Sequence, residues 1–468
     1  MRELRLVSLF SGAGGLDLGF AWSRYRITFA SDVLEPALRT YSVNFGLKLA
    51  SCKGKEIAEA QPGTSLVCDV ARVNFTPLKE IEPDVVVGGP PCQDFSLVRG
   101  PEWDRKGIKV RRGRLYAHFV RALAVLQPKA FLFENVPGLI SANKSFAYKA
   151  ILEDLSNLNL RWSEVKKDIG NGSPAEQVQG YKIIFSGIVD FSRFGVPQRR
   201  KRLIIVGVRK DLVKTPDELL KIKSAFTRKL KEAEKLFPKY PMTTIEVFEG
   251  KRLDELEAKY KEIMEKWNGV WLEVNTEKAW SWKAEVWDRL TFDIVKDYLV
   301  ANEVKSSSKE ELEEALRWHE EVLKELGFYG IPVSVIRPPD GTNDLPYDDP
   351  AVVERMKRIP FDENHEIVRA TNWEVEGKGI SLVYRRLHPL KPSHTIVAYG
   401  GGGTHGYHYD RDRTTLTLRE RARLQTFPDA FFFSGSKTQV RAQIGEAVPP
   451  LAAKRLAQAL ADALIDLE

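Results

Sequence analysis

Short apolar runs, many of them rich in β-branched side chains, alternate with turns and helix-like segments over residues 4–210. Such runs fit buried strands, and they cover residues 4–10, 27–31, 66–68, 85–87, 130–133 and 203–208. Apolar residues recur at helical spacing between some of them, at residues 16–22 and 115–126. Strands that alternate with helices predict an α/β fold, in which helices cover both faces of a mostly parallel sheet.

The middle of the chain has a different pattern, because residues 210–329 are dense in Lys and Glu with helical periodicity. Residues 253–267 and 309–326 are the clearest predicted helices. A group of tryptophans falls in this stretch, and we interpret it as the core of a small helical unit rather than as base-stacking platforms. These are Trp267, Trp271, Trp280, Trp282 and Trp287.

Patterned runs return in the last third of the chain, after residues 331–347, where Pro and Gly are frequent. Thr417 predicts a helix cap, because Glu420 follows three residues later. Residues 443–464 predict a turn and then a strongly amphipathic helix, which we expect to pack back onto the first domain.

Composition narrows the class of protein. With 468 residues, 43% of them hydrophobic and 29% charged, the chain fits a soluble globular protein of about two to three domains. No apolar stretch reaches the ~18 residues that a membrane span needs, and the N-terminal residues lack a secretory-signal pattern. The net charge of +7 favours a polyanionic partner without requiring one.

Three cysteines occur, Cys52, Cys68 and Cys92, and their spacing matches no metal-ligand pattern. We therefore expect no disulfide, no metal site and a reducing, cytoplasmic location. Cys92 lies in DVVVGGPPCQDFS, residues 84–96, where glycines and prolines end a β-branched run. A thiol just past a strand end lies where open α/β sheets bind ligands, and it is a nucleophile if its pKa is lowered. Taken alone, a free cysteine is more often a small buried hydrophobe.

Other predicted strand ends also carry candidate chemistry. The first strand runs into the loop SGAGG, residues 11–15, and a strand, glycine loop and helix in succession let a backbone approach a nucleotide-like ligand. Asp32 is placed either to bind a ribose or to be a charge at a helix N-terminus. Asp69 alone is more often a turn residue, but with the loop and Asp32 it favours a cofactor site. Glu134 is either a buried general acid or a solvated turn carboxylate.

Two basic segments accompany these strand ends. Residues 99–114, rich in Gly, Arg and Lys, are either a solvated surface loop or a lid that closes over a phosphate backbone. Gln198, Arg200 and Arg202 alternate into a predicted strand, and period-two spacing predicts that all three side chains share one face. Such a face suits a base or a phosphate group, or it is a protective basic strand edge.

The ordered motifs resemble those of the C5-cytosine DNA methyltransferases, over nearly the whole chain apart from residues 210–379. The matching blocks are FSGAGG (10–15), GGPPCQDFS (88–96), ENV (134–136), PQRRKR (197–202), LTLRERARLQTFPD (416–429) and IGEAVPP (444–450). The resemblance implies a Rossmann-like S-adenosylmethionine methyltransferase domain over residues 1–210, completed by residues 437–468. It also implies a smaller target-recognition domain with a helical insertion over residues 211–436.

By the same resemblance, the Cys92 thiolate adds to C6 of a cytosine flipped out of a specific double-stranded DNA site, and C5 takes the methyl group of S-adenosylmethionine. Glu134 is the implied acid near N3 or N4 of the base, and Arg200 contacts the base carbonyl, with Gln198 and Arg202 in support. The implied cofactor-binding residues are Phe10, Ser11, Gly12, Ala13, Gly14, Gly15, Leu16, Asp32, Val33, Asp69, Val70, Gly89, Pro90, Glu446, Ala447 and Val448. The implied DNA-binding residues are Gln93, Ser96, Arg99, Arg112, Arg114, Thr395, Gly401 and Gly402.

One residue departs from the family pattern: Glu446 stands where the last block usually has Asn, and a carboxylate there would alter cofactor affinity. Three alternatives were weighed. A tRNA cytosine methyltransferase would carry a CFT block in its recognition region, and this sequence has none there. A catalytically dead DNA-binding regulator would lack Cys92 or Glu134, and both are present. An NAD-dependent oxidoreductase leaves PPCQ and PQRRKR unexplained. We expect a monomeric DNA (cytosine-5-)-methyltransferase of a restriction-modification system or another prokaryotic defence or epigenetic system. A cognate endonuclease or defence-system partner is compatible with that expectation.

Overall fold

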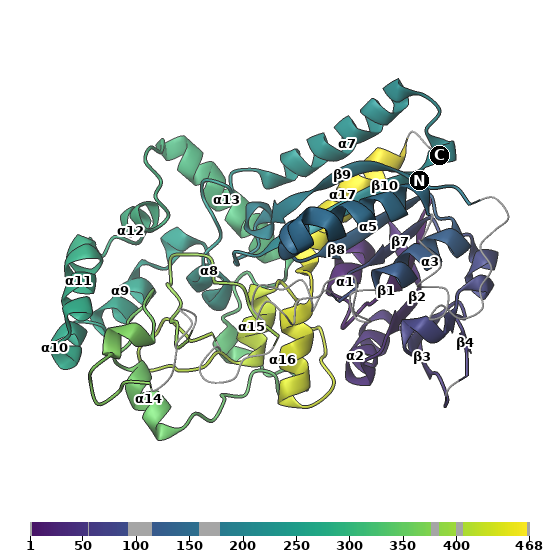
Figure 1. Ribbon diagram of the computed structural model, residues 1–468. Coiled ribbons are helices and arrows are strands. Elements are labelled where there is room, and N and C mark those ends of the chain that lie inside the picture. Colours follow the sequence, from purple (N-terminus) through teal and green to yellow (C-terminus); the bar gives the residue numbers. More distant parts are fainter. Residues whose placement is uncertain are drawn as a thin grey trace. The chain divides into compact units, whose positions relative to one another are not determined.

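The computed structural model describes residues 2–54, 56–91, 115–158, 178–375, 383–398 and 406–465. They form two compact units (Figure 1). The sheet unit comprises Met1–Phe191, Lys201–Ala233 and Ala447–Glu468, and the helical unit comprises Ser192–Arg200 and Glu234–Glu446. Each unit is therefore built from segments that are far apart in the sequence.

An eight-stranded sheet forms the centre of the sheet unit as far as the structure describes it, in the order β3-β5-β2-β1-β7-β8-β10-β9. Its strands are β1 (Leu4–Leu9), β2 (Tyr25–Asp32), β3 (Lys48–Ser51), β5 (Thr64–Val67), β7 (Val85–Gly88), β8 (Ala130–Asn135), β9 (Tyr181–Asp190) and β10 (Lys201–Arg209). Pairing is parallel from β3 to β8, and β10 runs antiparallel to both β8 and β9. The short strands β4 (Ala58–Glu59) and β6 (Val73–Asn74) pair separately. The predicted mostly parallel sheet is confirmed.

The strand order identifies the edge of the sheet where ligands bind. β1 lies between β2 and β7, and the chain forms β2 on one side before it returns to the other side for β7. The carboxyl end of β1 is therefore a switch point in strand order, where open α/β sheets bind ligands. All of β7 is buried, as its β-branched run predicts.

Helices cover this sheet. They are α1 (Gly15–Ala21), α2 (Glu35–Phe45), α3 (Tyr116–Leu126), α4 (Gly138–Ser141), α5 (Phe146–Asn157), α7 (Pro216–Glu234) and α17 (Pro450–Leu464). Phe119 of α3 makes edge-on ring contacts with Phe131 and Phe133 of β8, with centroids 6.0 and 5.4 Å apart. A Cβ added at Gly19 of α1 would lie 2.4 Å from the Cβ of Ala453 in α17. The C-terminal helix thus packs closely on the first unit, and that prediction is confirmed.

The helical unit is built mainly from short helices joined by long irregular segments (Figure 1). The helices are α8 (Thr244–Glu249), α9 (Glu257–Glu265), α10 (Val270–Val274), α11 (Glu277–Glu285), α12 (Ile294–Ala301), α13 (Lys309–Glu325), α14 (Pro350–Met356), α15 (Leu418–Leu424) and α16 (Lys437–Glu446). Short 3-10 turns of both units are η1 (Val70–Arg72), η2 (Thr76–Ile81), η7 (Ala142–Ser145), η8 (Phe191–Phe194), η9 (Lys210–Leu212), η10 (Leu253–Glu255), η11 (Trp287–Arg289), η12 (Val333–Val335) and η13 (His365–Val368). No helix in the described ranges is long and apolar enough to cross a membrane.

Two predictions for the helical unit are confirmed. Thr417 caps α15, because its hydroxyl accepts from the Glu420 backbone N–H while the Glu420 carboxylate accepts from the Thr417 N–H. The tryptophans form a core: Trp271 and Trp282 are buried, and the Trp287 ring lies 5.4 Å from the first and 6.1 Å from the second. The tryptophan at position 280 differs, since it is 43% exposed.

The expectation of no disulfide is wrong, because Cys52 and Cys68 are joined by one. The reason lies in the sheet. Parallel β3 and β5 pair Ser51 with Val67, so the next residue on each strand meets its counterpart, with the Cα atoms 5.3 Å apart. That distance fits a disulfide. The sequence alone does not reveal a pairing that depends on strand register.

Candidate active site

The loop after β1 has several residues in the uncommon backbone region of positive φ. Phe10, Gly12 and Gly14 have positive φ values of 54°, 53° and 91°. Glycine adopts this region freely, whereas a phenylalanine there is strained and points to a function. A Cβ added at Gly14 would lie 2.4 Å from the Phe45 ring. The loop and the N-terminus of α1 are therefore held tightly against α2.

Asp32, at the end of β2, fastens this loop. Its Oδ2 accepts from the Gly12 N–H at 2.9 Å, and its Oδ1 accepts from the Leu34 N–H at 2.9 Å. Burial raises the pKa of Asp32, and the backbone N–H groups partly offset this. Both interpretations of Asp32 therefore stay open. Its carboxylate accepts from the backbone just before α2, as a charge at a helix N-terminus would, and it also lies beside the glycine loop, as a ribose-binding residue would. Val33 is 64% exposed directly after it.

Asp69 follows β5 and caps η1, where its Oδ1 accepts from the Ala71 N–H at 3.0 Å. The turn interpretation thus accounts for one of its carboxyl oxygens. Cys68, the residue before Asp69, donates its N–H to the Asp32 carbonyl oxygen at 2.9 Å. The disulfide and this hydrogen bond together hold the ends of β2, β3 and β5 in register.

Glu134 lies near the end of β8, between Arg202 and the backbone of Gly89. Arg202 Nε of β10 is 3.0 Å from its Oε1, and the Glu134 side chain is only 13% exposed. Burial lowers the pKa of Arg202, and the neighbouring carboxylate opposes that shift. A Cβ added at Gly89 would lie 2.7 Å from Glu134 Oε2. Glycine at that position therefore lets the carboxylate lie directly against the backbone that leads to Cys92.

Asn135 is a functional candidate that sequence reasoning missed. Its Nδ2 donates to the Pro90 carbonyl oxygen at 3.1 Å, and its Oδ1 accepts from the Val136 N–H at 2.8 Å. Asn135 therefore ties the segment after β7 to the end of β8. The only available signal was its place in the block ENV, beside Glu134.

In the helical unit, Arg200 and Gln198 are buried and bind backbone groups. Arg200 donates from Nη1 to the Ile396 carbonyl at 3.1 Å and from Nη2 to the Gly445 carbonyl at 2.9 Å. Gln198 Oε1 accepts from the Ile396 N–H at 2.9 Å, and its Nε2 donates to Gln425 Oε1 at 2.9 Å. Gln425, which the sequence did not single out, therefore positions Gln198.

The shared face predicted for the three PQRRKR side chains is only partly found. Gln198 and Arg200 precede β10 and both contact Ile396, whereas Arg202 lies within β10 and pairs with Glu134. The strand begins at Lys201, so period-two alternation does not extend back to the first two residues.

The remaining predicted residues differ in their contacts and in their burial. Thr395 donates its hydroxyl to the Arg199 carbonyl at 2.7 Å, and the Glu446 carbonyl accepts from Arg200 Nη2 at 3.4 Å. Ser11 and Ala447 are half-buried, and the following are buried: Ala13, Gly15, Leu16, Val70, Pro90 and Val448. The following lie outside the described residues: Cys92, Gln93, Ser96, Arg99, Arg112, Arg114, Gly401 and Gly402.

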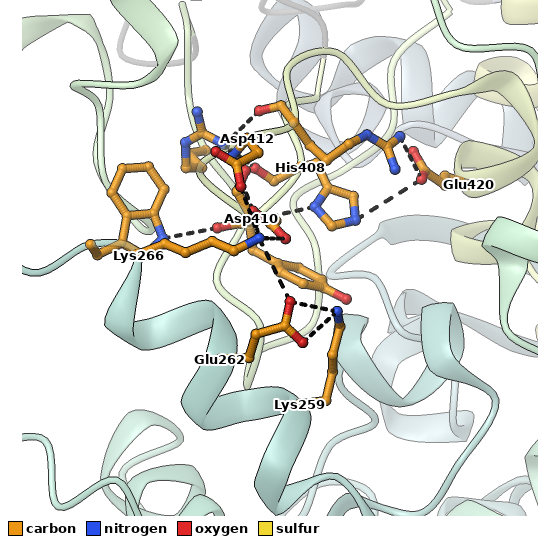
Figure 2. Close-up of polar contacts among 11 residues, drawn as sticks. Lys259, Glu262, Lys266, His408, Asp410, Asp412 and Glu420 are labelled. Atoms are coloured by element: carbon orange, nitrogen blue, oxygen red, sulfur yellow. Dashed lines mark hydrogen bonds and ion pairs between the residues drawn. The ribbon is translucent and has the colours of Figure 1, made fainter.

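A polar network joins α9 to the segment before α15 within the helical unit, and Figure 2 shows it. Lys266 Nζ lies 2.9 Å from a carboxylate oxygen of Asp410 and of Asp412. His408 Nδ1 accepts from the Asp410 N–H at 3.0 Å, and its Nε2 lies 4.0 Å from Glu420 Oε1. Burial and neighbouring cations lower the pKa of His408 well below its usual value. The imidazole is therefore neutral, and the network is a structural connection.

The switch-point loop and the carboxylates at three strand ends define a Rossmann-like α/β protein with a candidate ligand site at the carboxyl edge of its sheet. A crystal structure of a prophage-encoded E. coli protein, described as a DNA modification methyltransferase, has the same fold, with a TM-score of 0.54 and 21% identity. It aligns over 98% of this chain and 99% of its own.

The chain belongs to the C-5 cytosine-specific DNA methylase family, whose model matches residues 4–462. The DNA (cytosine-5-)-methyltransferase M.ApeKI of Aeropyrum pernix is 63% identical over 99% of both chains. The type II methyltransferase M.NgoFVII of Neisseria gonorrhoeae is 30% identical over 97% of this chain and 86% of its own. The resemblance inferred from the motifs, and the enzyme class it implied, are confirmed.

Proposed function

We propose that the chain transfers a methyl group from S-adenosylmethionine to C5 of a cytosine in double-stranded DNA, through a covalent bond between Cys92 and C6. Family membership supports the reaction class. The geometry at the ends of β7 and β8 supports the roles that we propose for individual residues. There the Glu134 carboxylate is paired with Arg202 and lies against Gly89, three residues before Cys92 in the sequence.

The glycine loop fits the proposed cofactor. A Cβ added at Gly12 would meet nothing within 4 Å, so open space adjoins the loop. Asp32 would accept hydrogen bonds from a ribose, Asp69 would accept from the adenine amine, and exposed Val33 offers apolar contact. The other residues proposed for this site are residues 10–16, Val70, Gly89, Pro90 and residues 446–448. When bound, S-adenosylmethionine supplies an electrophilic methyl group.

The proposed chemistry explains the residue types. The Cys92 thiolate forms a bond to C6 and shifts the C5–C6 electron pair to C5, which would then take the methyl group as its bond to the cofactor sulfur breaks and S-adenosylhomocysteine is left. Glu134 stabilises the developing charge on the base from the N3 or N4 side, and Arg200 contacts the base carbonyl. Loss of the C5 proton to a base and cleavage of the sulfur–C6 bond restore the ring and the thiolate. Because C5 and C6 are attacked from above the ring, the cytosine must leave the base stack.

The DNA part of the proposal rests on the helical unit and on the relatives. We assign target recognition to residues 211–436 and DNA contacts to Thr395 and to the predicted residues that lie outside the described ranges. The relative from Neisseria gonorrhoeae is named a type II methyltransferase. We therefore propose a restriction-modification role, with the chain acting as a monomer.

The first experiment is bisulfite sequencing of DNA from cells that express the chain or its Cys92→Ala variant. We expect one defined cytosine context to be methylated by the parent and not by the variant. Purified Cys92→Ala should still bind duplex DNA, because binding rests on many phosphate and base contacts. Methylation by the variant near the parent level would overturn the covalent mechanism. Soluble parent protein that methylates no DNA would contradict the substrate assignment.

A further inference from the structure

Arg421, in α15, is a buried arginine that forms no ion pair with a carboxylate in the described part of the chain. It is 1% exposed, and its Nε and Nη2 have no hydrogen-bond partner among the described residues. Arg441, in α16, is half-buried, and its Nε is likewise buried without a partner in the described part of the chain. A guanidinium carries five donors and stays charged, so leaving its donors unpaired and desolvated costs stability.

The neighbouring arginines of the same helix are paired. Arg419 Nη2 lies 2.9 Å from Asp340 Oδ2, and Arg423 Nη2 lies 2.6 Å from Asp429 Oδ2. These two side chains are also fully buried. Helix α15 therefore buries three arginines in alternating positions, and only the middle one lacks a carboxylate in the described structure. Because its two neighbours have carboxylate partners and it has none there, Arg421 has donors left over for another anion.

The Glu420 carboxylate partly offsets the charge of Arg421 but forms no ion pair with it among the described residues. The adjacent Glu420 carboxylate already accepts from the Thr417 N–H at 2.8 Å and from Arg413 Nη2 at 2.9 Å. Figure 2 shows the Glu420 carboxylate beside the His408 ring, to which a dashed line joins it. Burial and the like charge of Arg441 lower the pKa of Arg421 to about 10. Two positive groups thus act on each other where an anion would relieve both the repulsion and the unpaired donors.

We propose that Arg421 and Arg441 together bind a phosphate group of the DNA backbone. This inference rests on the proposed function. Planar guanidinium forks match phosphate oxygens, and two of them from adjacent helices suit one tetrahedral anion.

The arginine pair lies on two helices that also hold proposed base-contacting residues. Gln425, at the end of α15, donates to the Ile444 carbonyl of α16 and also binds Gln198. Arg200 donates to the carbonyl of Gly445, which also lies in α16. The two helices that carry the arginine pair therefore also hold Gln198 and Arg200. A phosphate bound there would set the register of the DNA relative to the proposed base-contacting residues.

The test measures binding of mixed-sequence duplex DNA across a range of salt concentrations, for the full chain and its variants. Backbone contacts are independent of sequence, so the target site need not be known. We expect Arg441→Gln and Arg421→Met to weaken binding roughly tenfold at low salt. The slope of log K against log [salt] should become shallower by about one. The matched control is Arg26→Gln, at an exposed position of β2 outside the residues proposed for recognition and catalysis, which should keep the parent slope.

Folding is monitored by the melting temperature and by S-adenosylmethionine binding. If Arg421→Met fails to fold, the half-exposed Arg441→Gln variant decides the question. Parent affinity and slope in folded variants would overturn the inference while leaving the proposed function intact. A parent that binds no duplex DNA at any salt concentration would instead overturn the proposed function.

Inorganic phosphate at constant ionic strength distinguishes the source of the anion. A rise in melting temperature for the parent that is lost in Arg441→Gln supports an anion site at this pair. If that rise is present but the DNA slopes of parent and variant are equal, the site takes a free anion and the assignment to DNA is overturned.

Discussion

The Arg202 guanidinium holds the Glu134 carboxylate from a diagonal position on the neighbouring strand, with Nε 3.0 Å from Oε1. Ile204 of β10 is the register partner of Glu134 in β8, so Arg202, two residues away, lies on the same face. Both side chains are less than one-sixth exposed, at 14% and 13%. The ion pair and the adjoining Gly89 backbone therefore fix where the carboxylate points.

Replacing Arg202 by Met should leave Glu134 mispositioned and without its cation. We expect single-turnover methyl transfer to slow by about 100-fold, the size of effect that a misplacement of about 1 Å can cause. S-adenosylmethionine affinity, measured by calorimetry, should stay within about twofold of the parent. Arg202→Lys should recover part of the rate, because it restores a cation but not the planar guanidinium with its paired N–H donors.

Glu134→Gln provides the comparison for that variant. We expect the same loss of rate with unchanged cofactor binding, and the double variant should be little worse than either single one, since the two residues act as a unit. Additive losses in the double variant would show that Arg202 acts independently of Glu134.

Asp17, in the first turn of α1, should make the sheet unit less stable as pH rises. Burial raises the pKa of Asp17 to about 7, although the hydroxyls of Ser8 and Tyr41 partly offset it. A carboxyl whose folded pKa exceeds its unfolded value stabilises the fold in its protonated form. Its contribution therefore declines between about pH 4 and pH 7. Asp17→Asn should gain about 2–3 kcal/mol relative to the parent between pH 5 and pH 8, measured by urea unfolding. A difference independent of pH would contradict a buried, titrating Asp17.

His319 should likewise contribute less stability as pH rises, here in the helical unit. Its Nδ1 lies 2.9 Å from Glu246 Oε1 and its Nε2 lies 3.0 Å from the Tyr240 carbonyl, and both side chains of this ion pair are fully buried. Burial lowers the pKa of His319, but the charge and hydrogen bond of Glu246 outweigh it, so the pKa is raised. Because two acceptors face the ring, the imidazolium is the form that fits.

The stabilisation from His319 is complete below the unfolded pKa of about 6.5 and is lost as pH rises through the higher folded pKa. We expect His319→Gln to cost about 3 kcal/mol at pH 6, since it breaks a buried ion pair, and less at pH 9. His365→Gln is the control, because His365 is only half-buried and contacts the Val383 carbonyl. An equal cost for His319→Gln at both pH values would argue that the ring is neutral.

The Cys52–Cys68 disulfide should stabilise the sheet unit. It closes a loop with a sequence separation of 16 residues, for which the chain-entropy account gives about 3 kcal/mol. Dithiothreitol should therefore lower the urea midpoint of the parent. A Cys52→Ser/Cys68→Ser variant should unfold at that lower midpoint with or without the reductant. A parent midpoint that does not respond to reductant would show that the thiols are unpaired in solution.

The sequence by itself determined the repeating elements and the points where they end. The β-branched run before Gly88, the SGAGG loop and the capping pair Thr417 and Glu420 are local features, since a strand, a turn or a cap depends on residues that are neighbours in the chain. The motifs likewise identified the family, because recognising them requires only their residues and their order along the chain.

Only the tertiary structure decided which side chains meet. The Cys52–Cys68 bridge depends on the register of β3 and β5, and the Arg202–Glu134 pair depends on that of β10 and β8. The alternation of residues in PQRRKR could not show that a strand begins at Lys201. Nor does the run of arginines in α15 indicate that Arg421 alone lacks a carboxylate among the described residues. Partners far apart in sequence are set by packing and register, and these are properties of the whole fold.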